Sequence, residues 1–314
     1  MGASLRIAWN TLGKDEYMSL CQQAVHPLAL QQSYAYGEMA AHLGALVLRA
    51  CIYENDVPIA ICQFHGKSMW GCLRLALAMR GPVWFKTVDN ETATQALRLL
   101  RHDIPLKAPR LPLIMPEWAE GSPETTTLKD AGLRQLITPY HTVMLDLQQD
   151  EDALLAAMDG KWRNRLRAAE RNGVTALQGS LKPEQYLWLL AKEAQQRRAI
   201  GYVALNPEAV VLYQAIAGKK NLLILKSMHE NSPSAGVMAL IHGHTATYHI
   251  GWSSEEGKKS GAHNVLMWEL MRQLKARGIK WLDLGGVNTE DAAGIARFKI
   301  GTGGKVVSLC GTYW

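Results

Sequence analysis

An aromatic residue and a lysine stand side by side near the end of the sequence, in GIARFKIGTGG (294–304). Phe298 is one of only three phenylalanines, and Lys299 lies between a helix-like turn and a glycine cluster. A fixed ammonium can stabilise negative charge that develops on a carbonyl oxygen. An aromatic wall would lower the local dielectric constant and strengthen that interaction. Taken by itself, the segment also fits an exposed loop lysine beside an ordinary glycine turn.

Basic residues gather in KWRNRLRAAER (161–171), which holds five of them and a single acid. We expect one helix through residues 150–173, in which Arg163, Arg167 and Arg171 recur every four residues and share a face. A row of arginines suits phosphate groups, although a solvated surface helix can carry the same pattern. The net charge is +6, so this local excess favours an anionic partner. The apolar stripe of the helix would be Leu155, Met158, Trp162, Leu166 and Ala169.

A second candidate anion site is KKSGAHNV (258–265). A glycine-containing loop that enters a helix exposes backbone N–H groups at the positive end of the helix dipole. Lys258 and Lys259 would add positive charge, and Gly261 would let the backbone come close to a phosphate. A plain solvated loop is the alternative.

The cysteines and the hydropathy pattern exclude several classes of protein. Five cysteines are scattered without CxxC spacing, which favours neither a disulfide framework nor a zinc site and is typical of a reducing cytoplasm. No stretch reaches the roughly 18 uninterrupted apolar residues of a membrane span, and the N-terminus lacks the pattern of a signal peptide. We therefore expect a cytoplasmic protein without a bound metal or a transmembrane segment.

The two halves of the chain repeat one order of elements. In each half, two strand-like runs flank a Glu-Asn turn, at Glu54–Asn55 and at Glu230–Asn231. An amphipathic helix and another short strand follow, with the helix at 91–103 in the first half and at 264–278 in the second. The repeat indicates a duplicated α/β unit.

Length and composition allow two domains of ordinary size, with 314 residues of which 48% are hydrophobic. We place an N-terminal domain at 1–137 and a C-terminal domain, with the reactive segment, at 138–304. The tail 305–314 would pack back on the N-terminal domain. The expected fold class is α/β, of the α+β kind, with mixed sheets flanked by helices.

Four segments, in this order, resemble the blocks of one family: QSYAYGEMAAHLG (32–44), RGPVWF (80–85), residues 142–174 and residues 261–304. The family is that of the Fem aminoacyltransferases, which belongs with the BioF2-like acyltransferases of the GNAT superfamily. No single block is specific, but the ordered set covers most of the chain. The resemblance implies two tandem GNAT-like domains, in agreement with the duplicated unit.

Enzymes of this family move an acyl group from an activated donor to an amine. The peptidoglycan members take an amino acid from aminoacyl-tRNA and attach it to the stem peptide of the cell wall. The resemblance therefore implies aminoacyl-tRNA as co-substrate, a small amine or a peptide as acceptor, and no permanently bound cofactor. It also implies that Lys299 polarises the donor carbonyl and that Phe298 lies in the active site.

Other residues of the second half would line the substrate cleft, namely Tyr248, Trp252, Asp283, Gly303 and Gly304. The two glycines would let the backbone approach a substrate closely. Asp283 and Glu269 are candidates by position for the base that deprotonates the amine. Asp283 could equally accept hydrogen bonds from backbone amides of the Gly285–Gly286 turn.

Two positions depart from the family pattern. Ala40 stands where the peptidoglycan members carry a lysine that contacts the nucleotide-sugar precursor, which places that acceptor in doubt. His263 stands where acyl-CoA enzymes of this fold have a small residue in their pyrophosphate loop, and its bulk would crowd that ligand. An acyl-CoA-dependent N-acetyltransferase or N-acyltransferase is nevertheless an alternative function. A non-catalytic protein that binds RNA or an anionic surface is a third.

Overall fold

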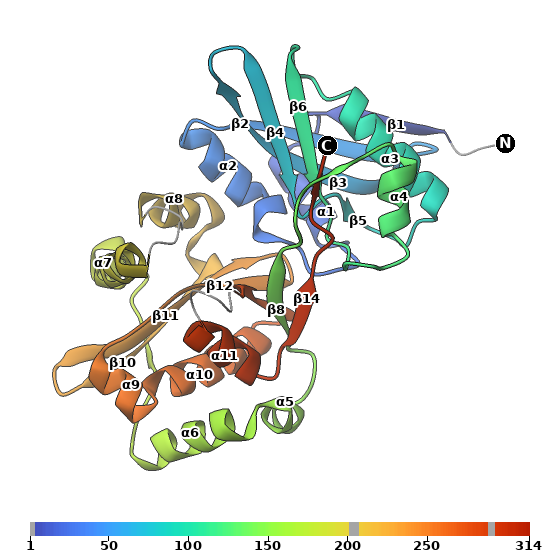
Figure 1. Cartoon of the computed structure of the whole chain (residues 1–314). Helices are drawn as coiled ribbons and strands as arrows, with labels where there is room; N and C mark the ends of the chain where they lie inside the picture. Colours follow the sequence, from blue (N-terminus) through green and yellow to red (C-terminus); the bar gives the residue numbers. More distant parts are fainter. Residues whose placement is uncertain (1–3, 201–206, 288–292) are drawn as a thin grey trace. The chain divides into compact units, whose positions relative to one another are not determined.

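The structure is a computed structural model that describes residues 4–200, 207–287 and 293–314. The chain forms two compact units (Figure 1). Unit 1 comprises Met1–Tyr140 with Ser308–Trp314, and unit 2 comprises His141–Val307. Each unit is built on one mixed sheet flanked by helices, so the predicted fold class is confirmed.

The strands of unit 1 are β1 (Leu5–Trp9), β2 (Leu46–Glu54), β3 (Val57–Met69), β4 (Leu73–Met79), β5 (Val83–Trp84), β6 (Arg110–Met115), β7 (Gln135–Ile137) and β15 (Thr312–Tyr313). Their order in the sheet is β1-β2-β3-β4-β6-β15-β7, with β5 beside β3. β4 and β6 are parallel, and β15 joins the sheet between β6 and β7. The helices are α1 (Lys14–Cys21), η1 (Leu30–Gln32), α2 (Tyr34–His42), α3 (Asn90–His102) and α4 (Thr125–Asp130).

The core of unit 1 includes α3, whose start is set by the local sequence. Asp89 caps the helix by accepting a hydrogen bond from the Thr92 amide at 2.7 Å. The amphipathic helix predicted at 91–103 is confirmed, because one face of α3 is buried, with Ala93, Ala96, Leu97 and Leu100. They belong to the same core cluster as the inward-facing residues of β2, β3 and β4.

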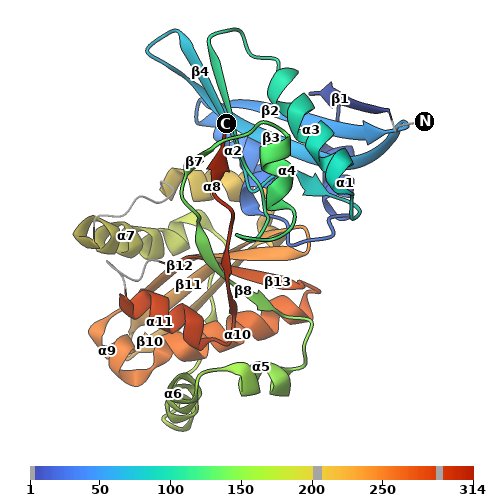
Figure 2. The same ribbon diagram turned by 45° about the vertical axis from the view of Figure 1, so that its right-hand side comes forward.

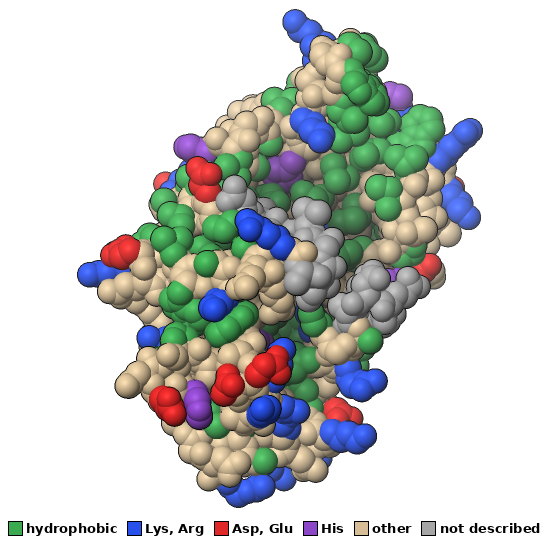
Figure 3. Space-filling model, turned by 60° about the vertical axis from the view of Figure 1, so that its left-hand side comes forward, with side chains coloured by type: hydrophobic (Ala, Val, Ile, Leu, Met, Phe, Trp, Pro, Cys, Tyr) green, Lys and Arg blue, Asp and Glu red, His purple; other side chains and the backbone are tan. Residues whose placement is uncertain are grey.

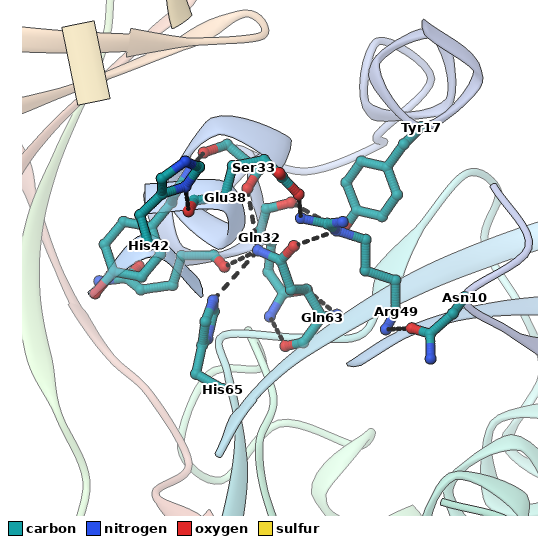
Figure 4. Close-up of polar contacts among 11 residues, drawn as sticks. Asn10, Tyr17, Gln32, Ser33, Glu38, His42, Arg49, Gln63 and His65 are labelled. Carbon is teal, nitrogen blue, oxygen red and sulfur yellow. Dashed lines mark hydrogen bonds and ion pairs between the residues drawn. The ribbon is translucent and has the colours of Figure 1, made fainter. Parts of the chain in front are cut away.

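The segment 32–44 is held by the polar cluster of Figure 4. The side-chain amide of Gln32 donates to the carbonyl of Gln63 at 3.0 Å, and the Gln63 backbone amide donates back to Gln32 Oε1 at 2.8 Å. Arg49 donates to Gln63 Oε1 at 2.7 Å and to Glu38 Oε1 at 2.8 Å. Ser33 caps α2. The residues that carry the first block of the resemblance thus fix α2 against β2 and β3.

The strands of unit 2 are β8 (His141–Asp146), β9 (Leu177–Gln178), β10 (Leu222–His229), β11 (Ser232–His242), β12 (Thr245–Ser253), β13 (Trp281–Gly286) and β14 (Lys305–Ser308). Their order is β14-β8-β13-β12-β11-β10-β9, and β12 and β13 form a parallel pair. The helices are α5 (Glu151–Ala157), α6 (Gly160–Arg171), α7 (Pro183–Ile200), α8 (Pro207–Ala217), η2 (Lys219–Asn221), α9 (Glu255–Ser260), α10 (Ala262–Ala276) and α11 (Ala293–Gly301).

The two faces of this sheet are covered by different helices. In Figures 1 and 2, α6 and α10 lie on one face and α7 on the opposite face. The face toward α10 holds the larger core, to which β8, β11 and β13 contribute alternate residues. Since α9 and α10 connect β12 to β13, they form the crossover that a parallel pair requires.

The expected helix through residues 150–173 is two helices. Met158 is extended, with φ −66° and ψ 145°, and Asp159 starts α6 by accepting hydrogen bonds from the amides of Lys161 and Trp162. The local capping interaction overrides the helical periodicity at this point. The expected apolar stripe still packs inward, because Trp162, Leu166 and Ala169 are buried on α6.

Among the residues that the structure describes, no helix is long and apolar enough to cross a membrane.

Candidate active site

The parallel strands β12 and β13 separate before either of them ends. Their register runs only from Thr245 opposite Trp281 to Thr247 opposite Asp283. β12 continues to Ser253 and β13 to Gly286. The carboxyl ends of parallel strands are where α/β proteins commonly bind ligands. The residues that could do chemistry in unit 2 cluster beside this separation.

A β-bulge determines which side chains of β12 face α10. Tyr248 and Ile250 pair with consecutive residues of β11, which leaves His249 as an extra residue. Tyr248, Gly251 and Ser253 therefore lie opposite β11 residues that point into the core beneath α10. Without the bulge, the period of two would send Gly251 and Ser253 to the other face.

His263, in the first turn of α10, is held between two hydroxyl groups. The Tyr248 hydroxyl lies 2.8 Å from His263 Nε2, and the Ser253 hydroxyl lies 3.0 Å from Nδ1. Gly251 makes room for this arrangement. A Cβ on Gly251 would come within 1.6 Å of Tyr248 Oη and 2.8 Å of His263 Cε1. The three polar groups thus form one hydrogen-bonded chain.

Burial keeps the His263 imidazole neutral. It lowers the pKa of His263 to about 4, and a hydrogen-bond interaction with the Trp252 backbone opposes that shift only in part. At neutral pH one ring nitrogen therefore donates a hydrogen bond and the other accepts one. A neutral imidazole between two hydroxyls can pass a proton from one to the other.

Phe298 packs at the meeting point of α6, α10 and α11. Its ring centroid lies 5.6 Å from that of Trp162 and 5.0 Å from that of His263, where the interplanar angle is 76°. The contact with His263 is edge-on and the contact with Trp162 is tilted, and together they fix the orientation of the Phe298 ring. The aromatic residue of the Phe-Lys pair therefore packs against the core and contacts His263 directly.

Lys299 extends from α11 to the end of β13. Its Nζ donates a hydrogen bond to the carbonyl of Gly286 at 2.8 Å. Burial lowers the pKa of Lys299 to about 8, while the charge of Asp283 opposes part of that shift. The side chain is half-buried on a helix and is not the exposed loop lysine of the simpler alternative. Below its pKa it presents a positive charge with reduced hydration.

The two candidate bases have structural partners. Asp283 is buried and accepts hydrogen bonds from the Thr142 hydroxyl at 2.6 Å and the Gly285 amide at 2.8 Å. The turn contact expected as the alternative for Asp283 is therefore present. Glu269 accepts from Arg272 at 3.1 Å and Gln273 at 2.9 Å along its own helix.

The structure separates Trp252 from Tyr248, although both were expected in one cleft. Trp252 packs on the α7 face. Its ring centroid lies 5.9 Å from the ring centroid of Trp188 and 5.5 Å from Lys192 Nζ. A spacing of four residues puts side chains on the same face of a regular strand. The bulge at His249 breaks that regularity and sends Trp252 to the opposite face.

One member of the expected row of three arginines makes hydrogen bonds within the protein. Arg163 donates to the carbonyls of Leu155 at 3.0 Å and Ala156 at 3.1 Å, so it satisfies the C-terminal end of α5. Arg163 is partly buried, so the two exposed arginines of the row are Arg167 and Arg171.

The loop at 258–265 is not an open phosphate cradle. Gly261, with φ +75°, joins α9 directly to α10 and is buried against α6. A Cβ on Gly261 would lie 3.2 Å from the Cβ of Ala169. Lys258 forms an exposed ion pair with Glu255 at 2.7 Å, and Lys259 is exposed. The Cα of Gly261 is therefore packed closely against α6.

Gly303 and Gly304 pack against protein backbone and side chains. A Cβ on Gly303 would lie 2.8 Å from the carbonyl of Ala157, and one on Gly304 would lie 2.5 Å from the Val143 side chain. These glycines let the chain after α11 pass closely over α5 and β8. The absence of a side chain at these two positions is therefore required by the packing of the protein itself.

Charges of both signs are interspersed on the face drawn in Figure 3, where Lys and Arg do not form a single field. Among the residues that the structure describes, no group of three or more His, Cys, Asp or Glu side chains could hold a metal ion.

Sequence reasoning missed His263 and Ser253 as members of this cluster. The sequence did give one indication for His263, because this bulky residue stands at a position where the pyrophosphate loop of acyl-CoA enzymes has a small one. Ser253 carried no signal, because its position depends on the bulge in β12.

Comparison with known proteins agrees with this geometry. A family model, described as an acetyltransferase (GNAT) domain, matches residues 134–299, which is more than half of the chain. The chain therefore belongs to the GNAT acetyltransferase-domain family, and it is an acyltransferase. No curated protein matches the chain.

Solved structures share the fold over nearly the whole chain. FemX is 14% identical, with a TM-score of 0.82 over 98% of this chain and 96% of that one. A tandem GNAT protein from the clavulanic acid biosynthesis pathway is 10% identical, with a TM-score of 0.55 over 99% and 98%. The C-terminal domain of a putative lysylphosphatidylglycerol synthetase from Agrobacterium fabrum is 15% identical, with a TM-score of 0.50 over 96% and 92%. The predicted tandem GNAT-like fold is confirmed.

Proposed function

We propose that this enzyme transfers an aminoacyl group from aminoacyl-tRNA to an amine, as the Fem aminoacyltransferases do. The observation that carries the proposal is the half-buried ammonium of Lys299 at the carboxyl end of β13. The Fem-like order of sequence blocks and the likeness in fold to FemX support the aminoacyl donor.

Lys299 stabilises the oxyanion that forms when the amine attacks the donor carbonyl. Its low hydration makes the ammonium a stronger partner for that charge than an exposed lysine would be. Phe298 holds the preceding position of α11 rigid through its contacts with Trp162 and His263. Loss of one such donor typically raises the barrier by about 2.7–4 kcal/mol.

The chain of Tyr248, His263 and Ser253 removes the proton that the amine must lose. In the proposed step the attacking nitrogen gives its proton to Tyr248 Oη as the Tyr248 proton passes to His263 Nε2. The proton on Nδ1 then passes to Ser253 and onward to solvent. The hydrogen bonds at 2.8 and 3.0 Å support this path.

Residues outside the Lys299 and His263 cluster would bind the donor and select the acceptor. Arg167 and Arg171, both exposed on α6, would contact phosphates of the tRNA. The acceptor is a small amine or a peptide, and a cell-wall stem peptide is the one that the Fem resemblance implies. Ala40 argues against recognition of a nucleotide-sugar precursor in the manner of the peptidoglycan members. We propose the cytoplasm as the site of action, in keeping with five free cysteines.

Acyl-CoA is the second candidate donor, because the matching family is named for acetyltransferases. The packing of Gly261 against α6 argues against a pyrophosphate at 258–265. Membership of an acyltransferase family favours both enzymatic alternatives over a non-catalytic RNA-binding or surface-binding protein.

The test compares donors with the whole protein. Transfer to a peptide with a free lysine side chain would be measured from radiolabelled aminoacyl-tRNAs, from acetyl-CoA and from a long-chain acyl-CoA. We expect turnover with aminoacyl-tRNA, and no heat of binding with either CoA thioester in calorimetry. Turnover with a CoA thioester alone would replace the proposed donor.

Lys299→Ala should lower that transfer about 10²–10³-fold. Lys305→Ala, at a nearby exposed lysine on β14, is the matched control and should leave it unchanged. A full rate in Lys299→Ala would show that the ammonium has no part in the reaction.

A further inference from the structure

The ribbon of β3 and β4 ends in a tryptophan that nothing in the proposed reaction uses. Trp70 is 82% exposed, the highest value among the large hydrophobic residues of the described chain. Tryptophan is normally well buried on average. A side chain of this size held in water needs an explanation other than packing.

The backbone at this turn is unfavourable for tryptophan. Trp70 has φ +51° and Gly71 has φ +72°, and the Cys72 amide donates to the carbonyl of Met69 at 3.2 Å. Turns with positive φ at both central residues strongly favour Asn, Asp or Gly at the first of them. A bulky residue at such a position is a reason to look for a function.

The β3 strand of the ribbon extends beyond its neighbour β2, since the register of β2 with β3 starts at Leu46 opposite Gly66, while β4 stays paired with β6 as far as Arg74. Beyond Gly66 one face of the ribbon is apolar. Met69 pairs with Leu73 and Lys67 pairs with Leu75, and the period of two puts these four side chains on the same face. The tip therefore combines Trp70, three aliphatic side chains and a lysine.

The chain around this ribbon carries basic residues and no acidic ones. Between Asp56 and Asp89 the sequence contains no acidic residue. Two of its basic residues are neutralised by ion pairs with distant acids, Arg80 with Glu117 and Lys86 with Glu54. Lys67 and Arg74, which both lie on the ribbon, have no acidic partner in the part of the chain that the structure describes.

We propose that the β3–β4 ribbon attaches the protein to the surface of an anionic lipid bilayer. Tryptophan is enriched at the headgroup level because its ring is amphipathic. Lys67 and Arg74 would be attracted by anionic lipids, and stable attachment generally takes both kinds of contact. The aliphatic face favours lipid over nucleic acid, which would use the tryptophan and the cations but not Met69 and Leu73.

The test is sedimentation of the whole protein with vesicles of phosphatidylcholine, and with vesicles of phosphatidylcholine and phosphatidylglycerol in equal amounts. We expect binding to the anionic vesicles only. Trp70→Ser should weaken it about tenfold, and Lys67→Glu should weaken it several-fold. The matched controls are Val57→Ser, an exposed residue at the opposite end of β3, and Lys129→Glu on α4. Both controls should bind as the wild type does.

A second measurement reports on the tip itself. Cys72 is the exposed cysteine and the other four are buried, so a thiol-reactive, environment-sensitive dye can label it selectively. We expect a blue shift of the dye emission when anionic vesicles are added.

The proposal is overturned by absence of vesicle binding, or by binding that Trp70→Ser does not weaken. It is also overturned if the dye at Cys72 responds to tRNA but not to vesicles, or if Trp70 governs self-association in their absence. These outcomes are independent of the proposed transfer reaction, because no step uses an acyl donor.

Discussion

Two histidines, one in each unit, have the same depressed pKa but very different surroundings. Burial, with a smaller effect of the Arg49 charge, lowers the pKa of His65 to about 4, and burial lowers that of His263 to about 4 as well. His65 contacts the side-chain amide of Gln63 at 3.3 Å, and its Nδ1 has no hydrogen-bond partner among the described residues. His263 lies between two hydroxyls and touches Phe298.

The difference shows that a perturbed pKa alone does not identify a reactive group. Both rings are neutral because both are removed from water. Only His263 has a partner on each nitrogen that can give and take a proton, and only His263 contacts the neighbour of a half-buried lysine. The polar cluster around His65 instead ties η1 and α2 to the sheet.

The comparison predicts that the same substitution affects the transfer rate strongly at His263 and little at His65. His263→Gln should lower the rate about 10²–10⁴-fold, because it interrupts the proton path. His65→Gln should leave it within a few-fold. A kcat and KM measurement for both variants, with folding checked by circular dichroism, decides the matter. Equal losses would place His65 and His263 in one functional category.

Both histidines should contribute in the same way to the pH dependence of the free energy of unfolding. Each has a pKa of about 4 in the folded protein, against an ordinary value of 6.5. Between these two pH values the unfolded state therefore binds more protons than the folded state. The stability that each contributes is present above pH 6.5 and is lost as the pH falls through about 4. The loss should be on the order of 2–3 kcal/mol for each ring. Urea unfolding at pH 7 and pH 4 should show a smaller pH difference in either Gln variant, and an unchanged difference would contradict the burial argument.

Each of the two histidine clusters has a glycine that leaves space for its side chains, and substitution of these glycines should have different effects. A Cβ on Gly37 would lie 2.1 Å from Gln63 Oε1 and 2.6 Å from Arg49 Nη2, while one on Gly251 would overlap the Tyr248 hydroxyl. Gly37→Ala should therefore lower the free energy of unfolding by about 1–3 kcal/mol. Gly251→Ala should act mainly on transfer, by displacing Tyr248. Thermal unfolding beside a rate assay separates the two, and a stable Gly37→Ala protein would speak against the structural role of the unit 1 cluster.

The smallest predicted effect is a decrease in the transfer rate at alkaline pH. With a pKa of about 8, Lys299 loses its charge as the pH rises past that value, and the rate should then fall about tenfold for each further pH unit. Lys299→Arg keeps its charge and should lack this limb, even if its rate is lower throughout. An identical limb in both proteins would assign it to another group.

Much of the fold was accessible from the sequence, because burial follows periodicity. The apolar stripe from Leu155 to Ala169, the core face of α3 and the duplicated order of strands and helices all appear in the structure. The Asp283 turn was accessible as well, since a carboxylate two residues before a glycine can reach its amide.

The parts of the site that escaped prediction depend on one-residue events and on contacts between distant segments. The bulge at His249 exchanges the faces of Gly251, Trp252 and Ser253, and no period of two reveals it. Arg163 was assigned to phosphate because its partners, the last carbonyls of α5, exist only once Asp159 divides the helix. The glycines after Lys299 were interpreted by local flexibility, while their role is set by α5 and β8.

The insertion of β15 between β6 and β7 bears on how the chain is made. During translation, β6 and β7 leave the ribosome long before the strand that belongs between them. Unit 1 must wait with an incomplete sheet until unit 2, including α11 with its lysine, has been synthesised. A polypeptide released before that point would therefore lack both the candidate acyl-transfer site and the strand that joins β6 to β7.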